Sequence, residues 1–244
     1  MSISLSVNVN KVATLRNSRG GDVPSVIAAV ETCLAAGAPG ITVHPRADQR
    51  HITPADVRDI ARVLRRDWPG IEFNIEGDPR PDLLDLVDEV RPDQCTLVPV
   101  VPGEITSQAG WRPGAMSAGV PDVVRRLHAN RVRVSLFVDA EAEPIRWAAG
   151  VGADRVELYT EPYARAFEQG PAAARDSFAR YVEAAELAHR VGLGVNAGHD
   201  LDLENLVLFR RLPHLDEVSI GHAIMSRALF VGLDTVVREY LQVL

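Results

Sequence analysis

The amino-acid sequence predicts an α/β protein in which residues 1–244 form a single TIM (β/α)8 barrel domain with extra helices. Three observations lead to this prediction. Eight short apolar runs recur along the chain, segments with helical spacing separate them, and no Gly-x-Gly-x-x-Gly turn follows the first run. Eight strand–helix units in a chain of this length favour a closed barrel over a doubly wound sheet, which is the main alternative.

The apolar runs give the strands of this barrel in order. We expect them at residues 3–9, 40–44, 71–75, 95–99, 132–138, 155–160, 193–197 and 217–221.

Helices are predicted between these strands. After the first strand, the glycine-bearing loop RNSRGGD precedes a helix that begins near Pro24. Thr53 to Asp56 read as an N-cap threonine, a proline at the first helical position and an acid in the first turn, so a helix should run to about Arg66. Further helices are expected over residues 172–190 and, in one or two pieces, over residues 224–244.

The connection after the fourth strand, residues 100–120, is long, polar and rich in glycine. A loop of this length in a compact domain is often functional, and at a barrel rim it suggests a closing lid.

Composition excludes several classes of protein. The net charge of −7 disfavours a broad basic surface for nucleic acid, although a local cationic pocket for a small anion is still compatible with it. No apolar stretch approaches the roughly 20 residues of a membrane helix. The first residues lack the basic flank and cleavage site of a signal peptide, so a cytoplasmic location is expected. Cys33 and Cys95 read as buried free thiols, and Lys11 is the only lysine.

Polar residues at or near the ends of the apolar runs are the candidate site. Because all strands of such a barrel end at one rim, these side chains should converge there. They are Asn8, His44, Arg46, Glu72, Glu157, His199 and His222.

The segment HPRADQRH places His44, Arg46 and His51 close together. An imidazole exchanges protons near neutral pH, and a guanidinium binds phosphate or carboxylate through two hydrogen bonds. The segment therefore predicts a base beside an anion site. The alternative is a solvated arginine-rich loop whose second histidine caps the next helix.

Two glutamates lie within strands. Glu72 is near the start of IEFNI, where alternation groups it with Asn74 and Glu76, and Glu157 lies inside RVELY. An inward carboxylate would have a raised pKa, which suits acid–base chemistry. The alternative is an ordinary polar layer in the barrel, or a carboxylate that faces a helix.

Gly-His pairs follow the seventh and eighth strands, at Gly198-His199 and Gly221-His222. Barrels commonly bind phosphate in these loops, through backbone amides and a helix N-terminus. The alternative is a pair of turn glycines followed by histidine caps. The spacing of the rim histidines does not match a preformed zinc site, so no metal is predicted.

The sequence resembles the pyridoxine 5′-phosphate synthase family of vitamin B6 biosynthesis, in order and over essentially the whole chain. The resemblance is carried by VNVNKVATLRNSRG (7–20), GITVHPRADQRHI (40–52), IEFNIE (71–76), QCTLVP (94–99), VSLFVDA (134–140), VELYT (156–160), VNAGHDL (195–201) and IGHAIMSRAL (220–229). It implies a barrel assembled as an octamer, without metal or organic cofactor. The implied reaction condenses 3-amino-2-oxopropyl phosphate with 1-deoxy-D-xylulose 5-phosphate to pyridoxine 5′-phosphate, phosphate and water.

The resemblance also implies residue roles. His44 and Glu72 would accept protons, His199 would donate one, and Glu157 would support transition states. The aminoketone phosphate would be held by Asn8, Gly221, His222 and the backbone of Asp200. The deoxyxylulose phosphate would be held by Arg46, His51 and, from the long loop, Thr106, with Arg19 as a further anion contact.

One departure from the family pattern concerns Asn10 and Lys11, where family members commonly have Asp-His in contact with the deoxyxylulose phosphate. Lys11 would replace the histidine as a cation, form an imine with the ketose, or reflect a change of substrate. The reading of Lys11 as a replacement cation is favoured.

Two rival functions remain at the level of sequence. One is another phosphosugar enzyme, an isomerase or aldolase, which would also use histidine, glutamate and phosphate loops at a barrel rim. The other is a barrel that binds a phosphorylated metabolite without catalysis. The joint presence of His44, Glu72 and His199 argues against the second.

Overall fold

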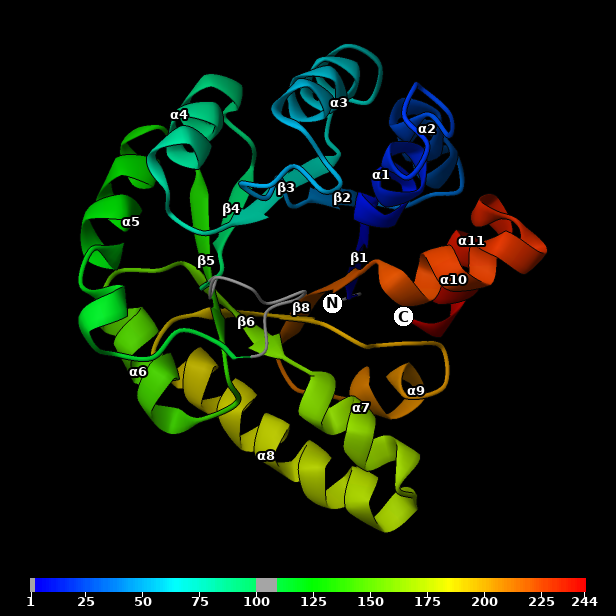
Figure 1. The fold of residues 1–244 in the computed structure, drawn as a ribbon. Coiled ribbons are helices and arrows are strands. Elements are labelled where there is room, and N and C mark those ends of the chain that lie inside the picture. The colour runs from blue at the N-terminus through cyan, green and yellow to red at the C-terminus, as the bar shows by residue number, and fades with distance from the viewer. Residues whose placement is uncertain (1–2, 100–108) are drawn as a thin grey trace.

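The computed structural model describes residues 3–99 and 109–244, and over these residues eight parallel strands close into a barrel (Figure 1). Each strand pairs with the next one along the chain, and β8 pairs with β1. The predicted TIM barrel is therefore confirmed. The strands are β1 (Ser4–Asn8), β2 (Gly40–Val43), β3 (Glu72–Gly77), β4 (Gln94–Leu97), β5 (Arg133–Val138), β6 (Arg155–Tyr159), β7 (Gly194–Gly198) and β8 (Leu215–Ile220).

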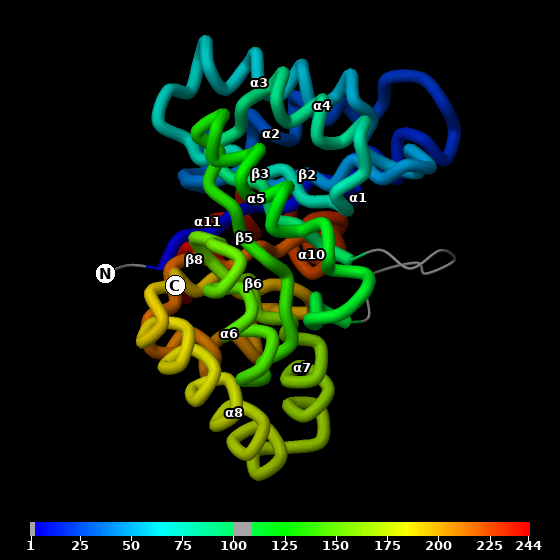
Figure 2. Tube along the Cα trace, turned by 90° about the vertical axis from the view of Figure 1, so that its left-hand side faces the viewer, coloured from blue at the N-terminus to red at the C-terminus, as the bar shows by residue number. Residues whose placement is uncertain are grey.

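Helices connect the strands and surround the barrel (Figures 1 and 2). Connections after β1, β6 and β8 each hold two α-helices, which accounts for the extra helices. In order, the helices are α1 (Asn10–Asn17), α2 (Val26–Ala35), α3 (Pro54–Asp67), α4 (Pro81–Val90), the 3-10 helix η1 (Ala115–Ser117), α5 (Val120–Ala129), α6 (Ala142–Gly150), α7 (Glu161–Glu168), α8 (Pro171–Arg190), α9 (Leu206–Phe209), α10 (His222–Val231) and α11 (Leu233–Val243).

The start of α3 follows from its sequence. The Thr53 hydroxyl accepts a hydrogen bond from the Asp56 backbone N–H at 3.3 Å, and the Asp56 carboxylate accepts one from the Thr53 N–H at 2.8 Å. This reciprocal pair satisfies donors that a helix end would otherwise leave unpaired. Arg16 of α1 donates to the same Asp56 carboxylate at 2.9 Å, so the cap also fastens α1 to α3.

The interior of the barrel is polar, whereas the apolar core lies between strands and helices. The hydroxyls of Ser6 and Thr42 are 2.6 Å apart, and the Thr96 hydroxyl donates to Asn74 Oδ1 at 3.0 Å. All four residues are buried. Buried polar groups are tolerated when they are hydrogen-bonded to one another. The polar layers that the sequence left as an alternative are therefore present below the rim.

Both cysteines are free and buried, as predicted. Burial raises the pKa of the Cys33 and Cys95 thiols to about 12, which leaves them protonated. Within the two described ranges, no helix is both long and apolar enough to cross a membrane.

Candidate active site

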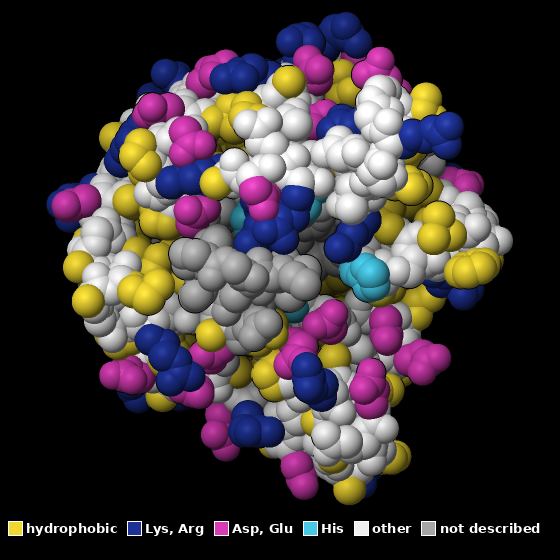
Figure 3. Space-filling model, viewed as in Figure 1, with side chains coloured by type: hydrophobic (Ala, Val, Ile, Leu, Met, Phe, Trp, Pro, Cys, Tyr) yellow, Lys and Arg dark blue, Asp and Glu magenta, His cyan; other side chains and the backbone are white. Residues whose placement is uncertain are grey.

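A pocket of about 450 Å³ opens where the strands end. On this face, Lys, Arg and His side chains gather near the centre of the molecule (Figure 3). Most of the residues singled out from the sequence line the pocket, although they come from strands at opposite ends of the chain. They are Asn8, Asn10, Lys11, His44, Arg46, His51, Glu157, His199, Asp200, Gly221 and His222.

Glu72 is not among the residues that line this pocket, which corrects the expectation that it reaches the rim. It is the first residue of β3, and its carboxylate pairs with Arg133, the first residue of β5. Glu76 lies four residues further towards the rim, or about 13 Å along the strand at ~3.3 Å per residue. Side chains alternate along a strand, so both glutamates face inward, and only Glu76 reaches the pocket.

Two other residues were expected to contact the substrates, Arg19 and Thr106. Arg19 is exposed in the turn after α1 and does not line the pocket. Thr106 lies outside the residues that the structure describes.

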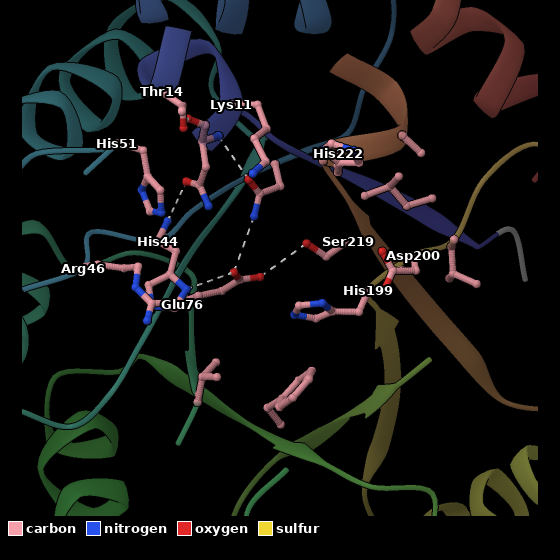
Figure 4. Close-up of a pocket in the computed structure, with 18 of the residues that line it drawn as sticks. Lys11, Thr14, His44, Arg46, His51, Glu76, His199, Asp200, Ser219 and His222 are labelled. Atoms are coloured by element: carbon pink, nitrogen blue, oxygen red, sulfur yellow. Dashed lines mark hydrogen bonds and ion pairs between the residues drawn. The ribbon is translucent and has the colours of Figure 1, made fainter. Parts of the chain in front are cut away.

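The Glu76 carboxylate, at the rim end of β3, contacts residues from β1, from the end of β2 and from β8 (Figure 4). One carboxylate oxygen accepts from Asn8 Nδ2 at 3.4 Å and lies 3.8 Å from His44 Nδ1. The other oxygen accepts from the Ser219 hydroxyl at 3.4 Å. Burial raises the pKa of Glu76 to about 7, so the group can take up or release a proton near neutral pH. The signal in the sequence was the alternation of Glu72, Asn74 and Glu76.

A hydrogen bond to its backbone holds His44 in place, whereas its ring is left to interact with a ligand. Its N–H donates to Asn10 Oδ1 at 2.9 Å. Burial, followed by the positive charge of Arg46, lowers the pKa of His44 well below its ordinary value, which keeps the imidazole neutral. At 3.8 Å the Glu76 contact is longer than a hydrogen bond, so the two groups are neighbours without being locked together.

His51, Arg46 and Lys11 form the basic wall of the pocket: His51 and Arg46 lie on the side opposite His222 and Asp200, and Lys11 lies between His51 and His222 (Figure 4). Burial and then the charge of Arg46 lower the pKa of His51 to about 4. Its ring centroid is 6.2 Å from that of His44. The concentration of positive charge that keeps this ring neutral would also attract an anion.

Glu157 lies in the middle of β6, and His199 directly follows the neighbouring strand β7. Glu157 is only 3% exposed. Burial raises its pKa well above the ordinary value, with the negative charges of Glu76 and Glu217 adding to the effect. Burial also lowers the pKa of His199, although nearby carboxylates oppose that shift. Burial thus favours the neutral form of both groups.

The N-terminus of α10 forms the other wall. The helix begins at His222 with Gly221 as its N-cap, and the unpaired N–H groups of a helix start attract anions. A Cβ on Gly221 would lie 2.9 Å from the Cβ of Asn8 and 3.0 Å from its carbonyl oxygen. Only glycine therefore permits this close approach of the helix start to β1.

Three buried polar atoms of the pocket residues lack hydrogen-bond partners within the described part of the chain. They are His44 Nε2, His51 Nδ1 and Glu157 Oε2. Buried polar groups are normally paired, so a polar ligand in the pocket would complete them. Among residues 3–99 and 109–244, no group of three or more His, Cys, Asp and Glu side chains is arranged to hold a metal ion.

A protein family described as pyridoxal phosphate biosynthesis protein PdxJ matches residues 5–244. The chain belongs to the PdxJ family. A pyridoxine 5′-phosphate synthase from Bacteroides thetaiotaomicron is 52% identical over 237 residues, covering 97% of this chain and 97% of the relative. The protein of the same name from Leptospira biflexa is 48% identical over 250 residues, covering 98% and 96%.

Solved structures with low sequence identity share the fold of this PdxJ member. Phosphoribosyl anthranilate isomerase from Thermus thermophilus superimposes with a TM-score of 0.59 at 15% identity, covering 99% of this chain and 98% of that one. At such identity the likeness supports the barrel alone, because unrelated functions share this fold.

Proposed function

We propose that this PdxJ protein is a pyridoxine 5′-phosphate synthase. It condenses 3-amino-2-oxopropyl phosphate with 1-deoxy-D-xylulose 5-phosphate and releases pyridoxine 5′-phosphate, inorganic phosphate and water. Relatives of that name, about half identical over nearly the whole chain, support the assignment. The observation that carries it is the arrangement of the pocket: two walls suited to anions flank a buried set of acid–base groups.

The two walls suit two phosphorylated substrates. Asn8, Gly221, His222 and the backbone of Asp200 would hold the aminoketone phosphate at the start of α10. Arg46, His51, Asn10 and Lys11 would hold the deoxyxylulose phosphate, because a guanidinium and an ammonium bind phosphate oxygens strongly. The contacts expected from Arg19 and Thr106 stay predictions of the sequence.

Joining the amine to the ketone and closing an aromatic ring requires repeated proton transfer. His44 and Glu76 would accept protons, since the first is neutral and the second titrates near pH 7. His199 would first take up a proton and then donate it, because a lowered pKa makes its imidazolium a stronger acid. Glu157, whose pKa burial raises, would in its protonated form donate a hydrogen bond to charge that develops in the transition state.

The rival functions fit the site less well. An aldolase that forms a Schiff base needs a lysine near the reacting carbon, and the only lysine, Lys11, lies on α1 with an exposed side chain. A desolvated lysine is the usual nucleophile in such enzymes. A barrel that only binds a phosphorylated metabolite would not need buried carboxyls and imidazoles with opposed pKa shifts.

The test is a synthase assay with purified protein and both phosphorylated substrates. Pyridoxine 5′-phosphate should appear together with an equal amount of inorganic phosphate, and neither should form when one substrate is omitted. The Bacteroides thetaiotaomicron relative serves as the positive control. If the relative forms the product and this protein does not, the proposed activity is wrong.

A homo-oligomer, an octamer by family resemblance, is also proposed. Leu229 and Phe230, which are 74% and 88% exposed near the end of α10, support an association surface there. Light scattering coupled to gel filtration measures the subunit number, and a monomer at micromolar concentration would contradict the proposal. The cytoplasmic location expected from the sequence stays a prediction.

A further inference from the structure

A buried threonine ties the ends of β6 and β7 together at the rim. Thr160 follows β6 directly and is fully buried. Its hydroxyl donates to the carbonyl oxygen of Gly198 at 2.6 Å and also contacts the carbonyl oxygen of His199. Its backbone N–H donates to the Gly198 carbonyl at 3.0 Å. One side chain thus reaches the two carbonyls on either side of the proposed proton donor.

The segment that Thr160 reaches has an unusual backbone. His199 has a φ of 81° and Asp200 a φ of 58°, so two successive residues other than glycine lie in the left-handed region. Such conformations persist when the surroundings impose them. Asn205 holds the far side of the segment, where its Nδ2 donates to the Asp200 carbonyl at 2.9 Å. Side chains therefore fasten this turn at both ends.

Hydrogen bonds to neighbouring elements hold the backbone around Thr160 in place. The Tyr181 hydroxyl, from α8, donates to the carbonyl of Tyr159 at 2.6 Å. The carbonyl of Thr160 accepts from the Ala164 N–H at 3.0 Å, within the first turn of α7. Because neighbouring elements hold the backbone before and after it, the hydroxyl of Thr160 can fix the β7 turn instead of moving with it.

The residue before His199 lies against Glu157. A Cβ added to Gly198 would overlap the Glu157 carboxylate, so the Gly198 backbone lies directly against that group. The His199 ring packs against Phe137 and Tyr159, with ring centroids 5.3 Å away in both cases. A small rotation of the peptide after His199 would therefore move the imidazole relative to Glu157 and to these aromatic rings.

We propose that Thr160 is a positioning residue, which fixes the orientation of His199 beside Glu157 through the carbonyls of Gly198 and His199. The proposal rests on the proposed function in so far as His199 takes part in proton transfer. Thr160 does not line the pocket, so its effect passes through His199.

The hydroxyl carries a single proton, which the two carbonyls share. If it is removed, the Gly198 carbonyl keeps the Thr160 backbone N–H as a donor, whereas the His199 carbonyl loses the Thr160 donor. Thr160→Val, which keeps the branched shape, should thus release the peptide after His199 selectively. Thr160→Ser keeps the hydroxyl, so the peptide after His199 should stay held as in the wild type.

The kinetic test compares Thr160→Val, Thr160→Ser and a matched control. Thr42→Val removes a buried hydroxyl from β2, outside the pocket lining, by the same change of side chain. Thr160→Val should lower kcat by about ten-fold to a hundred-fold, the size of effect that a small misplacement of a catalytic group produces. Its KM values should stay near those of the wild type, and Thr160→Ser and Thr42→Val should keep most of kcat. Equal losses in Thr160→Val and Thr42→Val, or in Thr160→Val and Thr160→Ser, would overturn the proposal.

Crystal structures of the two Thr160 variants give a readout that does not depend on activity. In Thr160→Val, the distances from the His199 ring to Phe137 and Tyr159 should change, and the φ of His199 should leave the left-handed region. In Thr160→Ser both should be retained. An unchanged His199 in Thr160→Val would overturn the proposal even if kcat falls. If the wild-type protein lacks synthase activity but the ring moves as expected, only the proposed function fails.

Discussion

At the scale of single residues, burial controls the charge of the proposed catalytic groups. Glu76 and Glu157 are carboxyls whose pKa values are raised, and His44 and His199 are imidazoles whose pKa values are lowered. Loss of water disfavours the charged form in each case, which shifts acids and bases in opposite directions. The usual order of the two types of group is thereby reversed, so that the Glu76 carboxyl holds a proton more tightly than the neighbouring His44 imidazole.

The location of Glu76 leads to a direct comparison with Glu72. Glu76→Gln removes a titrating group that touches Asn8, His44 and Ser219 while keeping the shape of the side chain. Its kcat should fall by about 10²-fold to 10⁴-fold, the usual contribution of general acid–base catalysis. Glu72→Gln, at the other end of β3, should keep most of kcat. Steady-state kinetics of the two variants decide between them, and a greater loss in Glu72→Gln would restore the expectation from the sequence.

Lys11 allows an unusually clean experiment because it is the only lysine. Its side chain is exposed at the basic wall, and its charge contributes to the lowered pKa of His51. If that charge is its role, Lys11→Arg should keep much of the activity, whereas Lys11→Met should raise the KM for 1-deoxy-D-xylulose 5-phosphate. Borohydride reduction in the presence of this ketose, followed by mass spectrometry, provides the opposing test. An adduct on Lys11 would show that it forms an imine.

At the scale of elements, the start of α10 and the end of β1 are packed too closely for any side chain at position 221. Gly221→Ala would place its Cβ against backbone as well as side-chain atoms of Asn8, so α10 must shift. The affinity for inorganic phosphate, measured as a competitive inhibition constant, should weaken by about ten-fold, or ~1.4 kcal/mol. Gly150→Ala is the matched control, since its Cβ would meet open space at the end of α6. Equal phosphate affinity in Gly221→Ala and the wild type would contradict the assignment of this wall.

Elements with strong local signals could be predicted from the sequence. The helix expected from Thr53 is α3, and the helix expected over residues 172–190 is α8, which runs from Pro171 to Arg190. Both have a proline at the first turn, and α3 has a complete capping box. The region 224–244 forms α10 and α11, which meet at Gly232, a residue with a φ of 91°.

Elements that depend on tertiary contacts were missed. Helix α1 runs to Asn17 and so includes the first two residues of the expected glycine loop, and its N-terminus has no side-chain cap. Its Arg16 and Asn17 are held by groups from the α3 region, namely Asp56 and the His51 carbonyl. The position of Glu72 was missed for a related reason. Alternation identifies the face of a strand, but the distance to the rim depends on the strand's register with its neighbours, here Glu72 with Gly40 and Asn74 with Gln94.

At the scale of the whole molecule, the barrel interior contains buried carboxyl groups whose pKa values are raised. Glu217 is 2% exposed, below the pocket, and accepts a hydrogen bond from Asn196 at 3.1 Å. Burial and then the charge of Glu72 raise its pKa to about 8. With Glu76 and Glu157, this makes three interior carboxyls that are protonated in the folded barrel at a pH where they ionise in the unfolded chain.

Those interior carboxyls predict how stability depends on pH. Between the unfolded pKa near 4.5 and the folded values of about 7 for Glu76 and about 8 for Glu217, the folded state binds more protons than the unfolded state. The free energy of unfolding must therefore decrease as pH rises through this range. The neutral histidines act in the opposite sense, but only below their unfolded pKa near 6.5, so the decrease should be clearest from pH 6.5 to 8.5.

Urea unfolding of the wild type and of Glu217→Gln measures the decrease in the free energy of unfolding over this pH range. The variant, which cannot ionise at this position, should lose less stability over the same interval. A wild-type stability that is constant or increases from pH 6.5 to 8.5, or equal slopes for the two proteins, would mean that Glu217 is already ionised in the folded barrel.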